Sequence, residues 1–386
     1  MKSEVRKSIE GYSQIAYEME ICRKYGIDYT AQKGRWKAAV ERLHPKRLQL
    51  RVAKIITETG TTSTLRLVPV SGYLPPFQAG QYINLFVDID GVRTARPYSI
   101  SSPPNQTAYY DITVRRVADG FVSSYLLDQV KVGDVLETTG PAGQFYYNPL
   151  IHGKDLVFLA GGSGITPFMS MIREVTDRLL LDRKIHLIYG SRSPQEAIFH
   201  KELMSLAADY SNFSYDLVIS DPGSGYEGLT GLIDADLIIS RIGSVEGKTF
   251  FICGPQEMYA FTIPELKELG VPDRRIRREL FGLPKQVYND PAWPKEVSPQ
   301  SVFTVKLSSG REIPARADEP LLVSMERAGL VIENCCRSGE CSLCRVKLVK
   351  GQVFHARTAK LRKSDHQAGY IHSCAAYPIS DVEIML

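Results

Sequence analysis

The sequence predicts a multidomain protein in which a short helical extension precedes an antiparallel β-barrel, a parallel α/β sheet and a compact β-rich module. Three observations support this fold class. Residues 47–145 hold short β-branched and aromatic runs separated by turn residues, and residues 154–282 alternate buried strands with helices. Five of the seven cysteines lie within the last 52 residues. A chain of 386 residues suits two to three domains of ordinary size.

The overall composition excludes several classes of protein. With 44% apolar and 23% charged residues, the chain is neither disordered nor built for a membrane. The formal net charge of +4, from 47 basic and 43 acidic side chains, is too balanced to indicate nucleic-acid or membrane binding. No run of 18 apolar residues occurs, so we expect no membrane span. Residues 1–10 are polar and mixed in charge, which predicts no export signal and a cytoplasmic location.

Residues 1–46 are predicted to form a helical extension. Apolar residues recur at alternating spacings of four and three, and a second stripe follows before Pro45. The two stripes are Val5, Ile9, Tyr12, Ala16 and Met19, and then Trp36, Ala39, Val40 and Leu43. Two interpretations remain open: the helices pack on the main body as a structural appendage, or they form a docking or dimerisation element.

Residues 47–150 are predicted to form the barrel, because the strand-like runs are short and separated by turn residues such as Asp90-Gly91. The expected strands are Leu48–Thr57, Thr64–Pro69, Tyr82–Val87 and Tyr110–Val117.

Residues 151–283 are predicted to form the parallel sheet. The expected strands are Leu156–Ala160, Ile185–Tyr189, Leu217–Ser220 and Thr249–Cys253, with helices at Phe168–Leu181 and Ala197–Leu206. Residues 284–300 contain four prolines among polar residues, which predicts a semi-extended linker before the module at 301–386.

The cysteine cluster carries the most specific spacing. Cys336, Cys341 and Cys344 follow a C-x4-C-x2-C pattern, and Cys374 comes after a further 29 residues. This is the spacing of plant-type [2Fe–2S] sites, in which the backbone wraps a small cluster. A four-cysteine zinc site more often shows two close pairs, and a Rieske centre needs two Cys-His pairs. Cys335 is surplus to the ligand set and is expected to be a small buried thiol.

Two motifs in the barrel suit a flavin. Arg96-Pro97-Tyr98-Ser99 offers a guanidinium for a pyrophosphate, a phenol ring to lie on an isoalloxazine, and a hydroxyl for its N5 edge. The segment Gly120-Phe-Val122-Ser123-Ser124 is expected to open a short helix whose N–H groups face a phosphate. Alone, the first motif is equally explained by a buried salt bridge and a turn.

Three motifs in residues 151–283 suit a pyridine nucleotide. Gly161-Gly162-Ser-Gly164-Ile-Thr166-Pro follows a strand and precedes a helix, so a pyrophosphate can approach the helix N-terminus closely. Cys253-Gly254-Pro255 follows the fourth strand, and Glu279-Leu-Phe281 closes the domain. Taken by itself, Cys253 is also explained as a core thiol.

The choice between NADH and NADPH depends on the residues after the second and third strands. A 2′-phosphate needs basic residues there, and Asp221 after the third strand would repel it. Arg192 after the second strand could attract it. The sequence therefore favours NADH and leaves NADPH open.

Together these motifs resemble the ferredoxin–NADP reductase superfamily, followed by a plant-type ferredoxin domain with the β-grasp fold, over residues 47–386. The resemblance implies FAD in the barrel, although FMN serves some fused members. It places Thr166 and Cys253 at the nicotinamide, and Glu279 and Phe281 near the flavin. Ser99, Thr166, Cys253, Glu279 and Phe281 are then the candidate catalytic residues, acting by positioning.

The same resemblance implies an NADH-dependent reductase that passes electrons through FAD and the [2Fe–2S] cluster to a partner metalloprotein. This domain order is similar to that of reductase components of oxygenases and demethylases, and to reductases of hybrid-cluster proteins. One departure is that residues 301–386 carry twelve basic and nine acidic residues, whereas many free ferredoxins are acidic. A stand-alone flavin oxidase or small-molecule reductase and a redox-sensing binding module are the alternatives.

Overall fold

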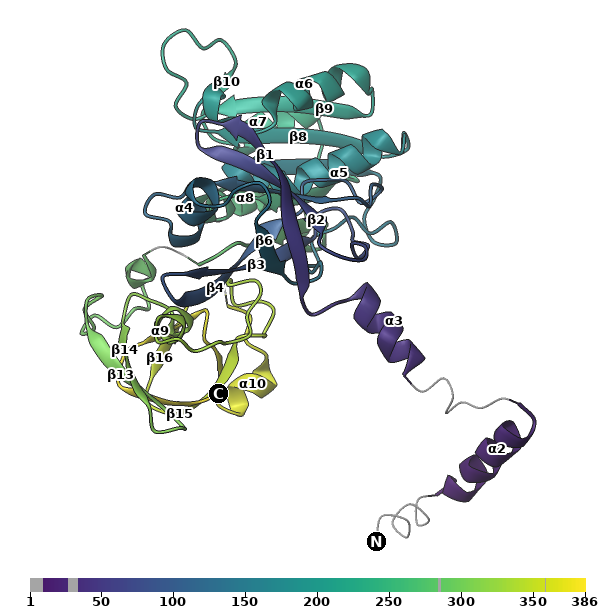
Figure 1. Cartoon of the computed structure of the whole chain (residues 1–386). Helices are drawn as coiled ribbons and strands as arrows, with labels where there is room; N and C mark the ends of the chain where they lie inside the picture. The colour runs from purple at the N-terminus through teal and green to yellow at the C-terminus, as the bar shows by residue number, and fades with distance from the viewer. Residues whose placement is uncertain (1–9, 27–33, 284–285, 358) are drawn as a thin grey trace. The chain divides into compact units, whose positions relative to one another are not determined.

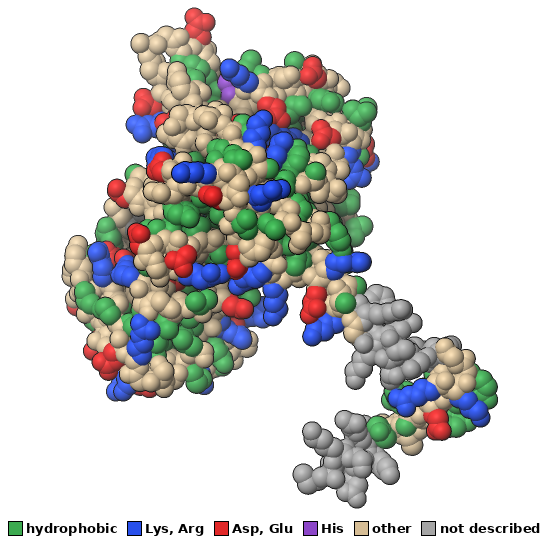
Figure 2. Space-filling view, viewed as in Figure 1, with side chains coloured by type: hydrophobic (Ala, Val, Ile, Leu, Met, Phe, Trp, Pro, Cys, Tyr) green, Lys and Arg blue, Asp and Glu red, His purple; other side chains and the backbone are tan. Residues whose placement is uncertain are grey.

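A computed structural model of the chain describes residues 10–26, 34–283, 286–357 and 359–386 (Figure 1). The chain separates into two compact units, Met1–Lys46 and Arg47–Leu386, which are described separately below. Among the described residues, no helix is long and apolar enough to cross a membrane. On the face of the molecule seen in Figure 2, acidic and basic side chains are interspersed, in keeping with the small net charge.

The described residues of the first unit form helices α2 (Tyr12–Lys24) and α3 (Arg35–Leu43). Both were expected from the apolar stripes, but Val5 and Ile9 lie outside the described residues. Along α2 no residue is buried, and Ile15 and Tyr17 are largely exposed within the described residues. Whether these helices serve packing or docking stays a prediction.

The barrel is a six-stranded antiparallel sheet that closes on itself. Its strands follow the order β4-β3-β6-β1-β2-β5, and a bridge between Ile100 and Ile112 joins the two ends. The strands are β1 (Leu48–Thr59), β2 (Thr62–Pro69), β3 (Tyr82–Ile89), β4 (Val92–Ser99), β5 (Tyr110–Arg115) and β6 (Val135–Thr138), and helix α4 (Phe121–Asp128) covers one end.

Strand β6 was not predicted, and β4 was expected only because the Arg96-Pro97-Tyr98-Ser99 motif was placed at the end of a strand. The β4 sequence contains two arginines and a proline, so it lacks the apolar alternation that marks a strand. The Asp90-Gly91 turn, with φ of 51° and 77°, instead folds β4 back onto β3 as a hairpin. This hairpin matters because β4 carries the predicted flavin motif.

The parallel-sheet domain has the predicted strand–helix alternation. Its strands lie in the order β10-β9-β8-β7-β11-β12, and every neighbouring pair is parallel. The strands are β7 (Asp155–Gly161), β8 (Lys184–Ser191), β9 (Phe213–Ile219), β10 (Leu229–Thr230), β11 (Thr249–Cys253) and β12 (Ile276–Glu279). The helices are α5 (Ile165–Asp177), α6 (His200–Asp209), α7 (Ala235–Ile242) and α8 (Gln256–Glu268).

The boundaries of two helices differ from the prediction. Helix α5 starts at Ile165 rather than Phe168, because a 3₁₀ turn at Gly162–Gly164 leads directly into it. Helix α6 starts three residues later than expected, after Phe199 adopts a left-handed backbone conformation with φ of 60°.

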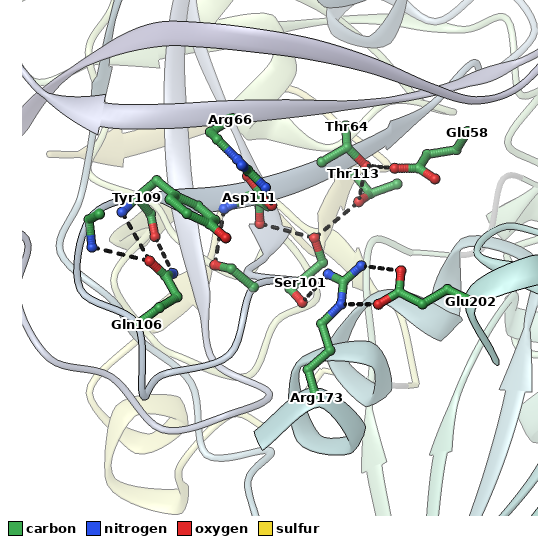
Figure 3. A network of polar contacts seen from close by, with 12 residues as sticks. Glu58, Thr64, Arg66, Ser101, Gln106, Tyr109, Asp111, Thr113, Arg173 and Glu202 are labelled. Carbon is green, nitrogen blue, oxygen red and sulfur yellow. Dashed lines mark hydrogen bonds and ion pairs between the residues drawn. The ribbon is translucent and has the colours of Figure 1, made fainter. Parts of the chain in front are cut away.

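The barrel and the parallel-sheet domain share a core and a polar network. Phe145 from the barrel packs edge-on against Phe168 and Phe251, with ring centroids 5.7 and 5.4 Å apart. Figure 3 shows Arg173 of α5 lying between the Ser101 carbonyl and Glu202. Its guanidinium donates to Ser101 O at 2.8 Å and to both Glu202 oxygens at 2.7 and 2.6 Å.

The cysteine-rich domain has a five-stranded sheet in the order β14-β13-β19-β15-β17 and a β16–β18 pair. Its elements are β13 (Val302–Leu307), β14 (Glu312–Arg316), α9 (Leu321–Arg327), β15 (Arg345–Lys350), β16 (Val353–His355), α10 (Lys363–Gln367), β17 (Tyr370–His372), β18 (Ala376–Pro378) and β19 (Val382–Met385). In the segment expected as a linker, Val287 and Trp293 are buried against Tyr377 of this domain.

Candidate functional site

Two cavities meet inside the larger unit. The first, of about 550 Å³, lies between the barrel and the cysteine-rich domain, and we call it the flavin cavity. The second, of about 980 Å³, lies between the barrel and the parallel sheet, and we call it the nucleotide cavity. Both are lined by Pro97, Tyr98, Val117, Ser123 and Phe281. A group bound beside Tyr98 and Phe281 would therefore face both cavities.

The predicted flavin motif lies on β4 and at the start of α4. Arg96, Pro97 and Tyr98 line the flavin cavity, and Ser99 lines the nucleotide cavity. At α4, Gly120, Val122 and Ser123 line the flavin cavity, whereas Ser124 lines neither. A Cβ at Gly120 would lie 2.9 Å from the Val117 carbonyl oxygen, so any other residue would force this turn to shift.

A second arginine, not predicted from the sequence, joins Arg96 at the flavin cavity. Arg337 comes from the cysteine loop and donates to Thr94 Oγ1 at 3.1 Å, and Arg96 donates to the same oxygen at 2.7 Å. Burial, and then the charge of Arg337, lowers the pKa of Arg96 to about 10, so it stays protonated at neutral pH. Glu326 forms a buried ion pair with Arg337. Two guanidinium groups beside one carboxylate leave positive charge facing the cavity, which suits a phosphate.

The glycine turn after β7 lies against the Cys253-Gly254-Pro255 turn after β11. A Cβ at Gly164 would lie 2.0 Å from the Cys253 carbonyl oxygen, and one at Gly161 would lie 2.8 Å from Pro255 Cδ. Gly162 adopts a φ of 52°. Thr166 Oγ1 donates to Ser163 O at 2.7 Å, which fixes the turn at the start of α5. These residues line the nucleotide cavity.

Of the remaining candidate catalytic residues, Phe281 lines both cavities and Cys253 lines the nucleotide cavity alone. Burial raises the pKa of the Cys253 thiol well above its ordinary value, so this thiol stays protonated. Glu279 is buried and lines neither cavity, and its Oε2 has no hydrogen-bond partner among the described residues. Burial, and then the Glu340 charge, raises the pKa of Glu279. Phe281 meets Tyr82 edge-on, with ring centroids 6.1 Å apart.

Arg192 and Asp221, which bear on the choice between NADH and NADPH, follow the ends of β8 and β9. Arg192 lines this cavity and pairs with Asp221 across 3.6 Å, and both side chains are largely exposed. Sequence reasoning missed Arg115, which also lines the cavity and forms an ion pair with Glu196. A Cβ at Gly162 would lie 2.6 Å from Arg115 Nη1, so this guanidinium covers the glycine turn.

The four predicted cluster ligands come together in the C-terminal domain. Cys336, Cys344 and Cys374 are buried, and Cys341 is partly exposed. Cys336 Sγ accepts N–H groups of Ser338, Glu340 and Cys341 at 3.5, 3.4 and 3.3 Å. Hydrogen bonds from the Cys341 thiol and from Ser338 hold the pKa of Cys336 well below its usual range.

The thiols contact one another as two pairs, Cys336 with Cys341 and Cys344 with Cys374. Two thiolates for each of two irons is the ligand requirement of a [2Fe–2S] rhomb, so the donor set fits this cluster. In the described part of the chain, no three His, Cys, Asp or Glu side chains are grouped as ligands of one metal ion. Cys374 also lines the flavin cavity. The surplus Cys335 is buried, as expected, and its thiol lies 3.4 Å from Tyr82 Oη.

Three domain families match successive parts of the chain. Residues 49–147 match the oxidoreductase FAD-binding domain, and residues 158–263 match the oxidoreductase NAD-binding domain. Residues 305–378 match the 2Fe-2S iron–sulfur cluster binding domain.

Relatives share this arrangement over most of their length. The glycine betaine monooxygenase reductase subunit of Pseudomonas aeruginosa is 32% identical over 353 residues, which cover 87% of this chain and 94% of the relative. The NADH oxidoreductase HCR of Escherichia coli is 30% identical, over 86% of this chain and 96% of the relative. The structure of phthalate dioxygenase reductase matches with a TM-score of 0.66 and 23% identity, over 88% of this chain and 98% of that one, which shows a common fold.

The chain therefore belongs to the family of modular reductases that combine FAD-binding, NAD-binding and [2Fe–2S] domains. It is an NAD(P)H-dependent flavin and iron–sulfur oxidoreductase that transfers electrons. The predicted fold class and cofactor types are confirmed.

Proposed function

We propose that electrons move from NADH in the nucleotide cavity, through FAD beside Tyr98 and Phe281, to a cluster on Cys336, Cys341, Cys344 and Cys374, and then to a separate metalloprotein. The corresponding domains are residues 47–150 for FAD, 151–283 for the nucleotide and 301–386 for the cluster, with 284–300 as the connection. The observation that carries this proposal is that Tyr98 and Phe281 line both cavities while Cys374 lines the flavin cavity.

The protein's own residues act by binding and positioning. Arg96 and Arg337 hold the flavin phosphates, and the α4 N-terminus from Gly120 supplies further N–H donors. The glycine turn receives the nucleotide pyrophosphate, and Thr166 and Cys253 shape the wall against which the nicotinamide lies. FAD supplies the conversion of a two-electron hydride into single electrons. One NADH thus reduces two one-electron acceptors and releases NAD⁺ and one proton.

NADH is the preferred donor in this proposal because Asp221 lies beside Arg192 and would repel a 2′-phosphate. The kcat/KM ratio for NADH over NADPH, measured for the wild type and Asp221→Ala, tests this choice. We expect the ratio to exceed ten in the wild type and to fall in the variant. A wild-type preference for NADPH would contradict it.

The acceptor is proposed to be an oxygenase-type metalloprotein in the same, cytoplasmic compartment. Relatives include reductase components of glycine betaine monooxygenase and 3-ketosteroid-9-alpha-monooxygenase, together with an NADH oxidoreductase.

The test measures NADH-driven reduction of a one-electron protein acceptor by the reconstituted wild type and Cys341→Ser. We expect the variant to lose nearly all protein-acceptor reduction but to keep ferricyanide reduction by the flavin. Wild-type turnover with oxygen or a quinone, equally fast in Cys341→Ser and without a protein acceptor, would favour the stand-alone flavin enzyme.

A further inference from the structure

The loop that holds the cluster ligands has two different sides. Asn334, Cys335 and Arg337 contact the barrel: the Asn334 carbonyl accepts from Asn84 Nδ2 at 2.8 Å, and Arg337 donates to Thr94. On the other side, between Cys341 and Cys344, Leu343 is 52% exposed. Leu343 therefore presents exposed apolar surface between two of the four predicted cluster ligands.

Several basic residues lie next to this turn in sequence or contact the same loop. Arg345 directly follows Cys344 and pairs with Asp365 of α10 at 2.7 Å. Lys360 pairs with Glu340 at 2.7 Å, and its backbone N–H donates to Gly339 O at 3.0 Å. These contacts place residues 359–365 beside the cysteine loop, although they are far from it in sequence.

The charge of this region is strongly one-sided. Residues 340–366 contain seven Lys and Arg but only two acidic residues, Glu340 and Asp365, and both acids are paired. Arg362 and Lys363, at the start of α10, are exposed and form no ion pair with any described residue. Asp365 of α10 is buried and pairs with Arg345. Because Arg345 directly follows Cys344, this pair holds the first turn of α10 near the cysteine loop.

We propose that Leu343, together with the basic residues Arg345, Lys360, Arg362 and Lys363, forms the surface through which the cluster delivers electrons to its acceptor, and that the acceptor presents an acidic surface around its own redox centre. This proposal rests on the proposed function, since it names the partner chemistry of the same cluster. Leu343 supplies an apolar contact near the cluster, and the basic rim steers an acidic partner toward it.

The experiment isolates the exit step from the donor side. The full-length holoprotein is reduced with dithionite, excess reductant is removed, and cluster reoxidation is followed after mixing with the acidic soluble domain of cytochrome b5 or with basic cytochrome c. The second-order rate constants are compared at low and high salt. The variants are Arg362→Glu/Lys363→Glu and Lys363→Glu, and the matched control is Lys306→Glu on β13, which β19 separates from β15.

For cytochrome b5 at low salt we expect about a tenfold loss in the double variant, a smaller loss in Lys363→Glu and little change in Lys306→Glu. For basic cytochrome c the same substitutions should raise the rate, because they remove like-charge repulsion. High salt should reduce both effects, because it screens exposed charges. Equal rates for the wild type and the double variant with both acceptors would overturn the proposed surface, and so would equal losses in Lys306→Glu.

The anaerobic reduction of the same proteins by NADH is measured in parallel. Because the exit step starts from dithionite-reduced protein, a failure of NADH to reduce the cluster would count against the proposed relay alone. Normal reduction by NADH with charge-insensitive reoxidation would count against the exit surface alone.

Discussion

The barrel contacts its two neighbouring domains in different ways. Its contact with the parallel-sheet domain is largely apolar, because Ala79 and Phe145 belong to the same core as Phe168 and Phe251. Its contact with the cysteine-rich domain is polar. No apolar cluster among the described residues joins barrel residues to residues 301–386.

The polar contact depends on a few paired groups between α9, the cysteine loop and the β3–β4 hairpin, which lie next to each other in Figure 1. Thr94 Oγ1 donates to Glu326 Oε2 at 3.0 Å, and Glu326 pairs with Arg337. Both of the charged side chains are at most 10% exposed. Apolar surfaces resist separation in water, whereas polar groups can exchange their partners for water. The barrel thus holds the parallel-sheet domain mainly through apolar packing and the cysteine-rich domain mainly through buried polar pairs.

The largest effect is expected at the polar contact. Replacing Glu326 by Ala leaves Arg337 and Arg96 without a carboxylate, and breaking a buried pair in this way costs about 3–5 kcal/mol. We expect at least a tenfold fall in the rate of flavin-to-cluster transfer, with flavin reduction by NADH retained, in anaerobic stopped-flow absorbance.

Two matched variants make this prediction specific. Glu326→Gln keeps a hydrogen-bond acceptor but removes the charge. Its flavin-to-cluster transfer rate should lie between those of Glu326→Ala and the wild type. Glu319→Ala breaks an exposed pair with Arg327 in the same domain, and such pairs contribute about 0–1 kcal/mol. A wild-type transfer rate in Glu326→Ala would show that this pair does not hold the docked domain.

A smaller effect is expected at the apolar contact. Arg173→Ala removes the pair with Glu202 and the bond to Ser101, at a cost of about 1–2 kcal/mol, while the shared core remains. The unfolding midpoint should fall by about 2–5 °C in thermal scans, with flavin-to-cluster transfer unchanged. Arg178→Ala, which breaks a more exposed pair at the end of the same helix, is the control. Loss of cluster reduction in Arg173→Ala would contradict the claim that only the contact with the cysteine-rich domain controls flavin-to-cluster transfer.

The smallest effect concerns pH at the apolar contact. His152 is buried against Phe251, and burial lowers its pKa below the ordinary 6.5. Below pH 6.5 the unfolded chain takes up a proton that the folded protein resists, so stability present above that pH is lost as the pH falls. In His152→Gln, the loss of thermal stability between pH 7.5 and 5.5 should be smaller, by about 1 kcal/mol or less. If the wild type and His152→Gln lost the same stability between pH 7.5 and 5.5, His152 would not be a source of the pH dependence.

Local sequence patterns predicted the parts of the site that a short stretch of chain forms by itself. The turn at Gly161–Gly164 is constrained by its own backbone and by its approach to Cys253, so its glycines appear as a motif. The cysteine spacing is constrained in the same way, because the loop from Cys336 to Cys344 supplies three thiols and the N–H donors around them.

The residues that sequence reasoning missed act across domains. Glu326 and Arg337 are eleven positions apart and acquire a shared role only when Thr94, more than 200 residues away, lies against them. Arg115 covers the glycine turn from a different domain. No periodicity or spacing marks such residues, since their partners are set by tertiary packing. For a related reason only the end of strand β4 was expected and its start was not: its polar residues line the cavity and contact the cysteine-rich domain rather than a core.

The most direct test of the electron path is an anaerobic absorbance titration of the reconstituted protein with NADH, repeated with NADPH and with Cys341→Ser. The proposed path predicts that NADH bleaches both the flavin and the cluster bands in the wild type. It also predicts that the cluster component is missing in Cys341→Ser, and that NADPH is less effective. A flavin that bleaches while an intact native cluster stays oxidised would contradict the path from Tyr98 and Phe281 to Cys374.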